Sequence, residues 1–310
     1  MFKPRRYSLL IGLAVALTLL ISACGGGSTG AGSTTPTSAP STLGTPGQTT
    51  CISGSLVASG STALAPLVQA VAQKYQSACS GAHITVNLGG SKTGLSQVEA
   101  GTVGVGNSDI FADKTTQADL VDHQVAVVIF GIIVNAKVGV KNLTTAQIQG
   151  IYAGTYTNWK QVGGPDMKIV VVSRPASSGT RATFQQYVLG GPEKVSGPAS
   201  LTTDSTGTVV TNVAQTDGAI GYASTGPAKK NTAITIISID GSEASAANCE
   251  SNTYKFWNIE HMYTKGQPSQ LAQALIDYMA SSDAASVAAD QDFIPLGQMQ
   301  PSAVQAHQPA

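Results

Sequence analysis

The sequence carries little charge and few aromatic side chains. Only 11% of its 310 residues are Asp, Glu, Lys or Arg, and only 5% are Phe, Trp or Tyr. Its 17 basic residues equal its 17 acidic ones, so no excess of positive charge is available for a nucleic acid, and we expect no such partner. A site for a small anion would therefore depend mostly on backbone and hydroxyl donors.

Histidine and cysteine are also scarce, and their spacing matches no metal site. The four histidines, His83, His123, His261 and His307, are scattered along the chain. Structural and catalytic metal sites need several such ligands that converge. We therefore expect no metal and no cofactor.

The one long apolar run lies at the N-terminus. Leu9 to Ile21 follows the positive residues Lys3, Arg5 and Arg6, and it is short for a bilayer span. Ile-Ser-Ala-Cys24 comes next and resembles a bacterial lipobox, in which the cysteine is lipidated. We expect residues 1–23 to be a lipoprotein signal peptide. A plain signal peptide cleaved nearby and an uncleaved anchor are the alternatives.

The next segment has too few large apolar side chains to fold. Residues 24–50 are rich in Gly, Ser, Thr and Pro and contain no charged residue. Such a segment cannot bury enough apolar surface, so we expect a disordered tether. Loss of three basic residues with the signal peptide leaves 14 − 17 = −3 charges. The exported protein would be held by its lipid at the outer face of the cell membrane, on the cell surface or in the periplasm.

Three cysteines remain after Cys24, and export permits disulfides. Cys51 opens an expected strand, and Cys79 closes the helix that follows it. A helix that returns antiparallel to its strand brings these two ends to one edge of the sheet, which favours a Cys51–Cys79 disulfide. Cys249 is then the odd cysteine, and its state is open.

Residues 51–310 alternate strand and helix patterns, which indicates an α/β fold. Three crossings from strand to helix share one device, a glycine beside Ser or Thr at the start of the helix. These turns are Gly60-Ser61-Thr62, Gly89-Gly90-Ser91 and Ala176 to Gly179. We expect strands over 53–59, 83–88 and 168–173, and helices over about 63–78, 93–100 and 180–189.

These turns suit an anion. Glycine lets the backbone approach a ligand closely, and a helix N-terminus presents unsatisfied N–H groups. Any single turn is better explained as an ordinary capped helix. Three such turns are more informative, because the carboxyl ends of strands in an open α/β sheet converge on one crevice.

Two charged residues near these turns indicate which kind of anion would bind. Arg174 ends its strand four residues before Ser178, and guanidinium suits bidentate binding of an oxyanion. Asp109 follows a short strand, and its carboxylate would repel an anion unless the ligand still carries a proton to donate. Phosphate carries such a proton at neutral pH and sulfate does not, so Asp109 would reject sulfate. An ordinary turn aspartate is the alternative.

As a set, these motifs resemble the phosphate-binding proteins of bacterial phosphate ABC importers, the component called PstS. The resemblance includes Gly60-Ser61-Thr62 with Pro66, Gly90-Ser91 with Gly94, and Gly101-Thr102-Val103 before Ser108-Asp109. It continues through Arg174 to Gly218-Ala219-Ile220-Gly221-Tyr222. The resemblance implies that phosphate is held by Thr62, Ser91, Asp109, Arg174, Ser178, Gly179 and Thr180.

The resemblance also implies a two-lobed, type II periplasmic-binding-protein-like fold with a hinge of two crossing strands. The crossings would be Val125 to Asn135 and about Asn258 to Thr264. Lobe one would comprise 51–128 plus 262–310, and lobe two 129–261. Such a protein is a non-enzymatic receptor, which we expect to be monomeric and to deliver phosphate to ABC permease subunits. One departure is Ala176, where the family often carries an acid that steadies the arginine.

Three other functions stay open. A binder of another oxyanion, such as sulfate or molybdate, would use the same turns, and the same lobes could serve a sensor. An exported serine hydrolase is the third, since Lys92-Thr93-Gly94 matches an element of penicillin-recognising enzymes. That group also needs a Ser-x-x-Lys nucleophile, and no lysine here has serine three positions before it.

Overall fold

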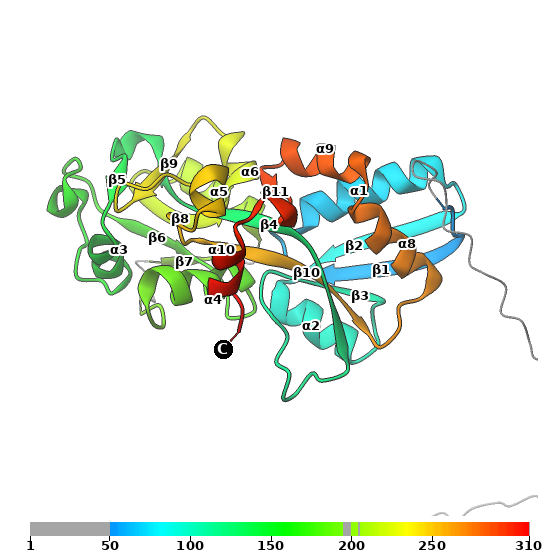
Figure 1. Cartoon of the computed structure of the whole chain (residues 1–310). Coiled ribbons are helices and arrows are strands. Elements are labelled where there is room, and N and C mark those ends of the chain that lie inside the picture. The colour runs from blue at the N-terminus through cyan, green and yellow to red at the C-terminus, as the bar shows by residue number, and fades with distance from the viewer. Residues whose placement is uncertain (1–49, 195–199, 204, 310) are drawn as a thin grey trace, which may run out of the picture. The chain divides into compact units, whose positions relative to one another are not determined.

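The computed structural model describes residues 50–194, 200–203 and 205–309. Within these ranges 11 strands join one sheet, whose main path runs β2-β1-β3-β10-β4-β8-β6-β7 (Figure 1). The strands are β1 (Gly54–Gly60), β2 (Ala82–Leu88), β3 (Val105–Ser108), β4 (Leu120–Asn135), β5 (Asn142–Leu143), β6 (Val170–Ser173), β7 (Ser200–Thr202), β8 (Ala219–Ser224), β9 (Ile234–Ile239), β10 (Trp257–Lys265) and β11 (Phe293–Ile294). The expected signal peptide, the lipidation site Cys24 and the tether up to residue 49 lie outside the described residues.

Helices cover the sheet, as an α/β fold requires. They are α1 (Ala65–Ala78), α2 (Ser91–Glu99), α3 (Thr145–Tyr152), α4 (Gly179–Phe184), α5 (Thr206–Gln215), α6 (Thr225–Lys229), α7 (Ala246–Glu250), α8 (Gln270–Met279), α9 (Ser282–Asp290) and α10 (Pro301–Ala306). Amphipathic spacing explains α1, whose Leu67, Val68, Val71 and Tyr75 are all buried.

Two long strands connect the two halves of this fold. β4 pairs antiparallel with β10 from Ile129 back to Leu120, and from Phe130 onward it pairs with β8 and β9 instead. We call the part built on β1, β2 and β3 the first lobe and the part built on β6, β7 and β8 the second lobe. The sequence thus predicted the crossing strands correctly, and β10 matches the expected span within a residue.

β4 begins five residues before the expected Val125. The cause is visible in its burial, because residues 126–135 are all buried whereas residues 120–125 are exposed or half-buried. An apolar run marks only the buried part of a strand. The predicted lobe boundaries, 51–128 plus 262–310 and 129–261, stay a prediction.

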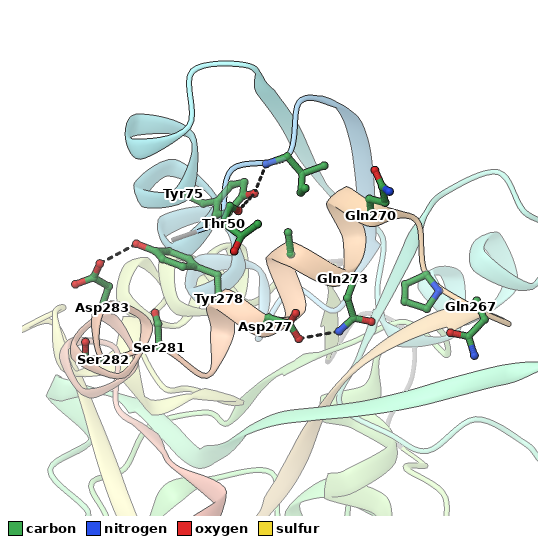
Figure 2. Close-up of a pocket in the computed structure, with 13 residues that line it drawn as sticks. Thr50, Tyr75, Gln267, Gln270, Gln273, Asp277, Tyr278, Ser281, Ser282 and Asp283 are labelled. Atoms are coloured by element: carbon green, nitrogen blue, oxygen red, sulfur yellow. Dashed lines mark hydrogen bonds between the residues drawn. The ribbon is translucent and has the colours of Figure 1, made fainter. Parts of the chain in front are cut away.

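A cavity of about 720 Å³ lies in the first lobe, between the start of the described chain and the α8–α9 pair (Figure 2). Four of its polar side chains form two hydrogen-bonded pairs. Tyr278 donates to Asp283 at 2.8 Å, and Gln273 donates to Asp277 at 2.7 Å. Both carboxylates that line the cavity therefore already accept a hydrogen bond from a neighbouring side chain.

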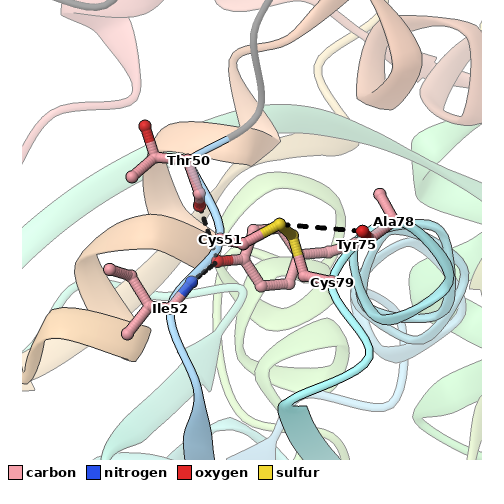
Figure 3. The surroundings of a disulfide bond; sticks show 6 residues. All are labelled: Thr50, Cys51, Ile52, Tyr75, Ala78 and Cys79. Atoms are coloured by element: carbon pink, nitrogen blue, oxygen red, sulfur yellow. Dashed lines mark hydrogen bonds between the residues drawn. A yellow bond between two sulfur atoms is a disulfide. The ribbon is translucent and has the colours of Figure 1, made fainter.

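The predicted disulfide joins Cys51 to Cys79 (Figure 3). It ties the chain just before β1 to the residue that follows α1. The Tyr75 hydroxyl strengthens the same junction, since it accepts from the Ile52 N–H at 3.0 Å and donates to the Thr50 carbonyl at 2.9 Å. Cys249, whose pairing was open, is a buried free thiol, and burial raises its pKa to about 12.

Removal of the disulfide should destabilise the protein without affecting the rest of the fold. The bridge closes a loop with a sequence separation of 28 residues. Chain entropy then predicts that the Cys51→Ser/Cys79→Ser variant loses about 3–4 kcal/mol of unfolding free energy. Urea unfolding measures this loss, and a reducing agent should destabilise the wild type but not the variant. Equal urea midpoints for wild type and variant would contradict the assignment.

Candidate anion-binding site

The first of the three predicted turns follows β1 and is built around Ser61. Its Oγ accepts from the backbone N–H groups of Ala63 and Leu64 at 3.1 and 2.9 Å, and it donates to Asp109 Oδ1. Gly60 precedes it with φ of 135°, and a Cβ there would lie 2.1 Å from the Asn107 carbonyl oxygen. Ser61 therefore satisfies the start of the helix, which leaves the Thr62 hydroxyl for other contacts.

The second turn places Ser91 at the first residue of α2. Its Oγ accepts from the Asp109 backbone N–H at 2.9 Å, so the second turn and the residue after β3 are linked directly. Gly90 before it has φ of 87°, and a Cβ there would lie 2.8 Å from the Ser177 carbonyl oxygen. The turn thus approaches the third turn, which belongs to the other lobe, more closely than a side chain would allow.

The third turn begins α4, and Ser178 is its N-cap. Its Oγ accepts from the Arg181 N–H at 3.2 Å. Thr180 Oγ1 donates to Asp109 Oδ2 at 3.0 Å, and the Ser177 carbonyl accepts from the Lys92 N–H at 3.1 Å. The second and third turns are therefore in direct contact across the two lobes.

Arg174, at the end of β6, contributes the positive charge of the cluster. Its Nη2 donates to Thr62 Oγ1 at 2.9 Å and its Nη1 to Thr206 Oγ1 at 3.5 Å. Thr206 opens α5, and its backbone N–H donates to Thr62 Oγ1 at 3.2 Å. Arg174 is only 1% exposed, so this guanidinium is removed from water where the lobes meet.

A second arginine supports the first. Arg181 Nη1 donates to the Arg174 carbonyl at 2.6 Å, and its Nε lies 3.1 Å from Glu193 Oε2. Tyr222 donates to the same carboxylate at 3.0 Å. Burial raises the pKa of Glu193, and the Arg181 charge opposes this shift. The Arg181–Glu193 pair thus holds the backbone of Arg174.

The structure brings all seven predicted residues into one buried cluster. Asp109 lies at its centre and is 2% exposed, and its backbone carbonyl accepts from Asn258 Nδ2 at 2.7 Å. Sequence reasoning missed Ser61, Thr206 and Asn258. Ser61 stands in a turn that was recognised, and Thr206 follows an N-cap serine, Ser205, but no local pattern marks Asn258.

The cluster combines one guanidinium, several hydroxyls, helix N-termini and one carboxylate. Among the described residues, His123, His261 and His307 hydrogen-bond to Thr264, Asp122 and Asn252 respectively, and none of these partners is a serine of the cluster. A buried set of hydroxyl and N–H donors around the Asp109 carboxylate suits a small oxyanion that keeps a hydrogen.

The comparisons with known proteins agree with this chemistry. The sequence matches the PBP superfamily domain over residues 40–283. It is 45% identical over 251 residues to the phosphate-binding protein PstS of Bacillus subtilis, covering 80% of this chain and 82% of the relative. The chain belongs to the PstS-type family of phosphate-binding proteins.

Solved structures extend the similarity. A phosphate ABC transporter substrate-binding protein from Clostridium perfringens, with bound phosphate, has a TM-score of 0.74 at 29% identity and covers 78% of this chain and 100% of its own. An ABC-type phosphate transport receptor from Vibrio cholerae has a TM-score of 0.63 at 28% identity and covers 77% and 99%. The two-lobed periplasmic-binding-protein-like fold is thereby confirmed. The family consists of substrate-binding receptors rather than enzymes.

The cavity of the first lobe does not compete as a site for an anion. The 720 Å³ cavity is lined by no Lys, Arg or His and by two carboxylates, Asp277 and Asp283. Residues 50–194, 200–203 and 205–309 contain no cluster of three or more His, Cys, Asp or Glu that could hold a metal. Within the same ranges no helix has the length and apolar character needed to cross a membrane.

A substitution at Gly179 should test the contact between the turns. A Cβ at this position would lie 2.2 Å from Ser91 Oγ and 2.9 Å from Asp109 Cβ. Gly179→Ala should therefore lower the unfolding free energy by about 1–3 kcal/mol through overpacking. Gly207→Ala is the matched control, because Gly207 is in a helix with nothing within 4 Å of a Cβ. Thermal unfolding that ranks Gly179→Ala as stable as Gly207→Ala would show that the turns do not touch in solution.

Proposed function

We propose that this chain is an exported, lipid-anchored receptor that binds inorganic phosphate between its two lobes and delivers it to an ABC permease. The names of its relatives support this function, and one observation carries it. Arg174 from the second lobe and Asp109 from the first lobe lie in the same buried set of hydroxyl and N–H donors.

Charged and neutral residues of the cluster have different roles in this proposal. Arg174 supplies the ionic contact to the anion. Thr62, Ser91, Ser178 and Thr180 supply hydroxyls, and Gly179 supplies a backbone N–H at the start of α4. Because charge is scarce, preorganised neutral donors and the helix N-termini supply the other contacts to the anion.

Asp109 sets which oxyanion is accepted. Its carboxylate is an acceptor only, so it needs a hydrogen from the ligand. A phosphate O–H supplies that hydrogen, whereas sulfate at neutral pH leaves two acceptors facing each other without a proton. Because the site is buried, a contact between two acceptors without a hydrogen costs free energy. The Asp109 carboxylate therefore selects an oxyanion that carries a proton.

Closure of the lobes follows from the same contacts. The hydrogen bonds of Thr62 with Arg174 and of Thr180 with Asp109 already join the two lobes. Phosphate held by donors from both sides adds contacts that exist only when the lobes are together, so it stabilises the closed arrangement.

In this proposal the lobes are 51–128 plus 262–310 and 129–261, the receptor is a monomer, and a lipid on Cys24 holds it at the membrane.

Replacement of Arg174 should remove most of the phosphate affinity. Arg174→Ala is expected to weaken binding by about 2–5 kcal/mol, as for truncation of one partner of a buried charge pair. Isothermal titration with phosphate, arsenate and sulfate, on protein stripped of ligand, measures the change. Lys92→Ala is the matched control, because it removes one positive charge from an exposed residue beside Ser91 and should leave the affinity nearly unchanged. A stripped wild-type protein that binds no phosphate would refute the proposal.

Replacement of Asp109 by asparagine should change selectivity more than affinity. The amide of Asp109→Asn can donate to an oxyanion oxygen, so the variant should bind sulfate, which the wild type rejects. Its loss of phosphate affinity should be smaller than that of Arg174→Ala. Titration of both variants with both anions decides this, and continued rejection of sulfate by Asp109→Asn would disprove the role of the carboxylate.

A further inference from the structure

A second acid lies next to Asp109 and takes no part in the contacts described so far. Glu260 is in β10, one of the two crossing strands, and is 0% exposed. β10 runs antiparallel to β3 with His261 opposite Ser108 and Met262 opposite Asn107. Asp109 directly follows β3, and extension of this register by one residue places it beside Glu260, close enough for its charge to act on the Glu260 carboxyl group.

Glu260 has no donor to satisfy a negative charge. Among the described residues neither of its carboxyl oxygens accepts a hydrogen bond. A buried carboxylate without a donor or counter-ion is very costly, and a proton removes most of that cost. Burial is accordingly the largest cause that raises the pKa of Glu260, and the charge of Asp109 is the next.

Asp109 is the ionisable side chain that interacts with Glu260, because the other charged groups nearby point to solvent or have partners of their own. β4 places Ala126 opposite Glu260. Of the ionisable residues of α2, Lys92 is exposed and Glu99 lies 3.9 Å from Lys265. His261, next in β10, pairs with Asp122 at 2.7 Å. The Arg174 guanidinium is engaged with Thr62 and Thr206.

We propose that Asp109 and Glu260 hold one proton between them, with Glu260 as the neutral donor and Asp109 as the ionised acceptor. Glu260 is then a positioning residue for the binding site. It orients the Asp109 carboxylate and keeps the pair at one negative charge instead of two. Two adjacent carboxylates would repel a phosphate anion, whereas one remains an acceptor for the phosphate O–H.

This inference rests on the proposed function for its role, but the shared proton can be tested without phosphate. Infrared spectroscopy of the ligand-free protein at neutral pH should show the carbonyl stretch of a neutral carboxylic acid. That band should shift when glutamate is labelled with carbon-13, and it should be missing from Glu260→Gln. Glu243→Gln, which alters an exposed glutamate, should lose only a carboxylate band. A Glu260→Gln spectrum that also loses only a carboxylate band, or a wild-type band that ignores the label, would overturn the proposal.

Stability as a function of pH gives a second test. The raised pKa means that the folded protein keeps a proton which the unfolded chain releases above about pH 4.3. The contribution of Glu260 to wild-type stability therefore declines as pH rises from there, whereas glutamine binds no proton in either state. The melting temperature of Glu260→Gln minus that of wild type should increase from acid to neutral pH, and the same difference for Glu243→Gln should stay flat. A pH-independent difference for Glu260→Gln would contradict a neutral Glu260.

Phosphate binding then tests the role of the pair. Glutamine keeps Glu260 neutral and able to donate, so Glu260→Gln should bind phosphate within about threefold of wild type at neutral pH and should still reject sulfate. A Glu260→Gln variant that admits sulfate would place the shared proton on Asp109 instead and overturn the assignment. If the wild type fails to bind phosphate, the proposed function fails, while the infrared and stability results still decide whether the proton is shared.

Discussion

Burial of the Arg174 guanidinium is the constraint on which the arrangement of the lobes depends. A cation removed from water is costly unless it meets charges or several oriented acceptors. Arg174 meets Thr62 and Thr206, and Thr62 belongs to the opposite lobe. Arg181 and Glu193 hold its backbone from behind, so the charge is presented at a defined place. The contact of this side chain with Thr62 is thus one of the hydrogen bonds that hold the two lobes together.

The rest of the cluster shows how a protein with little charge can prepare a site for an anion. Its polar groups are mostly neutral hydroxyls and backbone N–H groups, and each is fixed by a turn at the end of a strand. Asp109 organises these turns, because it receives hydrogen bonds from Ser61 and Thr180 and its backbone contacts Ser91 and Asn258. The one residue that would repel an anion is therefore also the residue that joins the turns together.

Local patterns in the sequence predicted the turns well, because each is built from neighbours in the chain. Gly60, Ser91 and Ser178 stand where a strand pattern gives way to a helix pattern, and Asp109 follows a short strand. The family resemblance then singled out Thr62 and Thr180 as ligand contacts. Asn258 and Glu260 could not be found in this way. They occupy an ordinary strand, and their importance comes from the pairing of β10 with β3, which depends on the whole fold. The sequence also did not predict that β4 begins at Leu120. Its first residues are exposed or half-buried, so no apolar pattern marks them.

The position of β10 in the sheet has a consequence for how the protein is made. The first lobe takes β1, β2 and β3 from the beginning of the chain, but its sheet continues through β10, and α8 and α9 come from near the end. Contacts between residues so distant in sequence make for slow folding. When the ribosome has synthesised the chain as far as α7, all three turns of the site have been made. β10, the strand next to Asp109, has not yet been made. The nascent chain is therefore expected to have no completed first lobe until its final segment emerges.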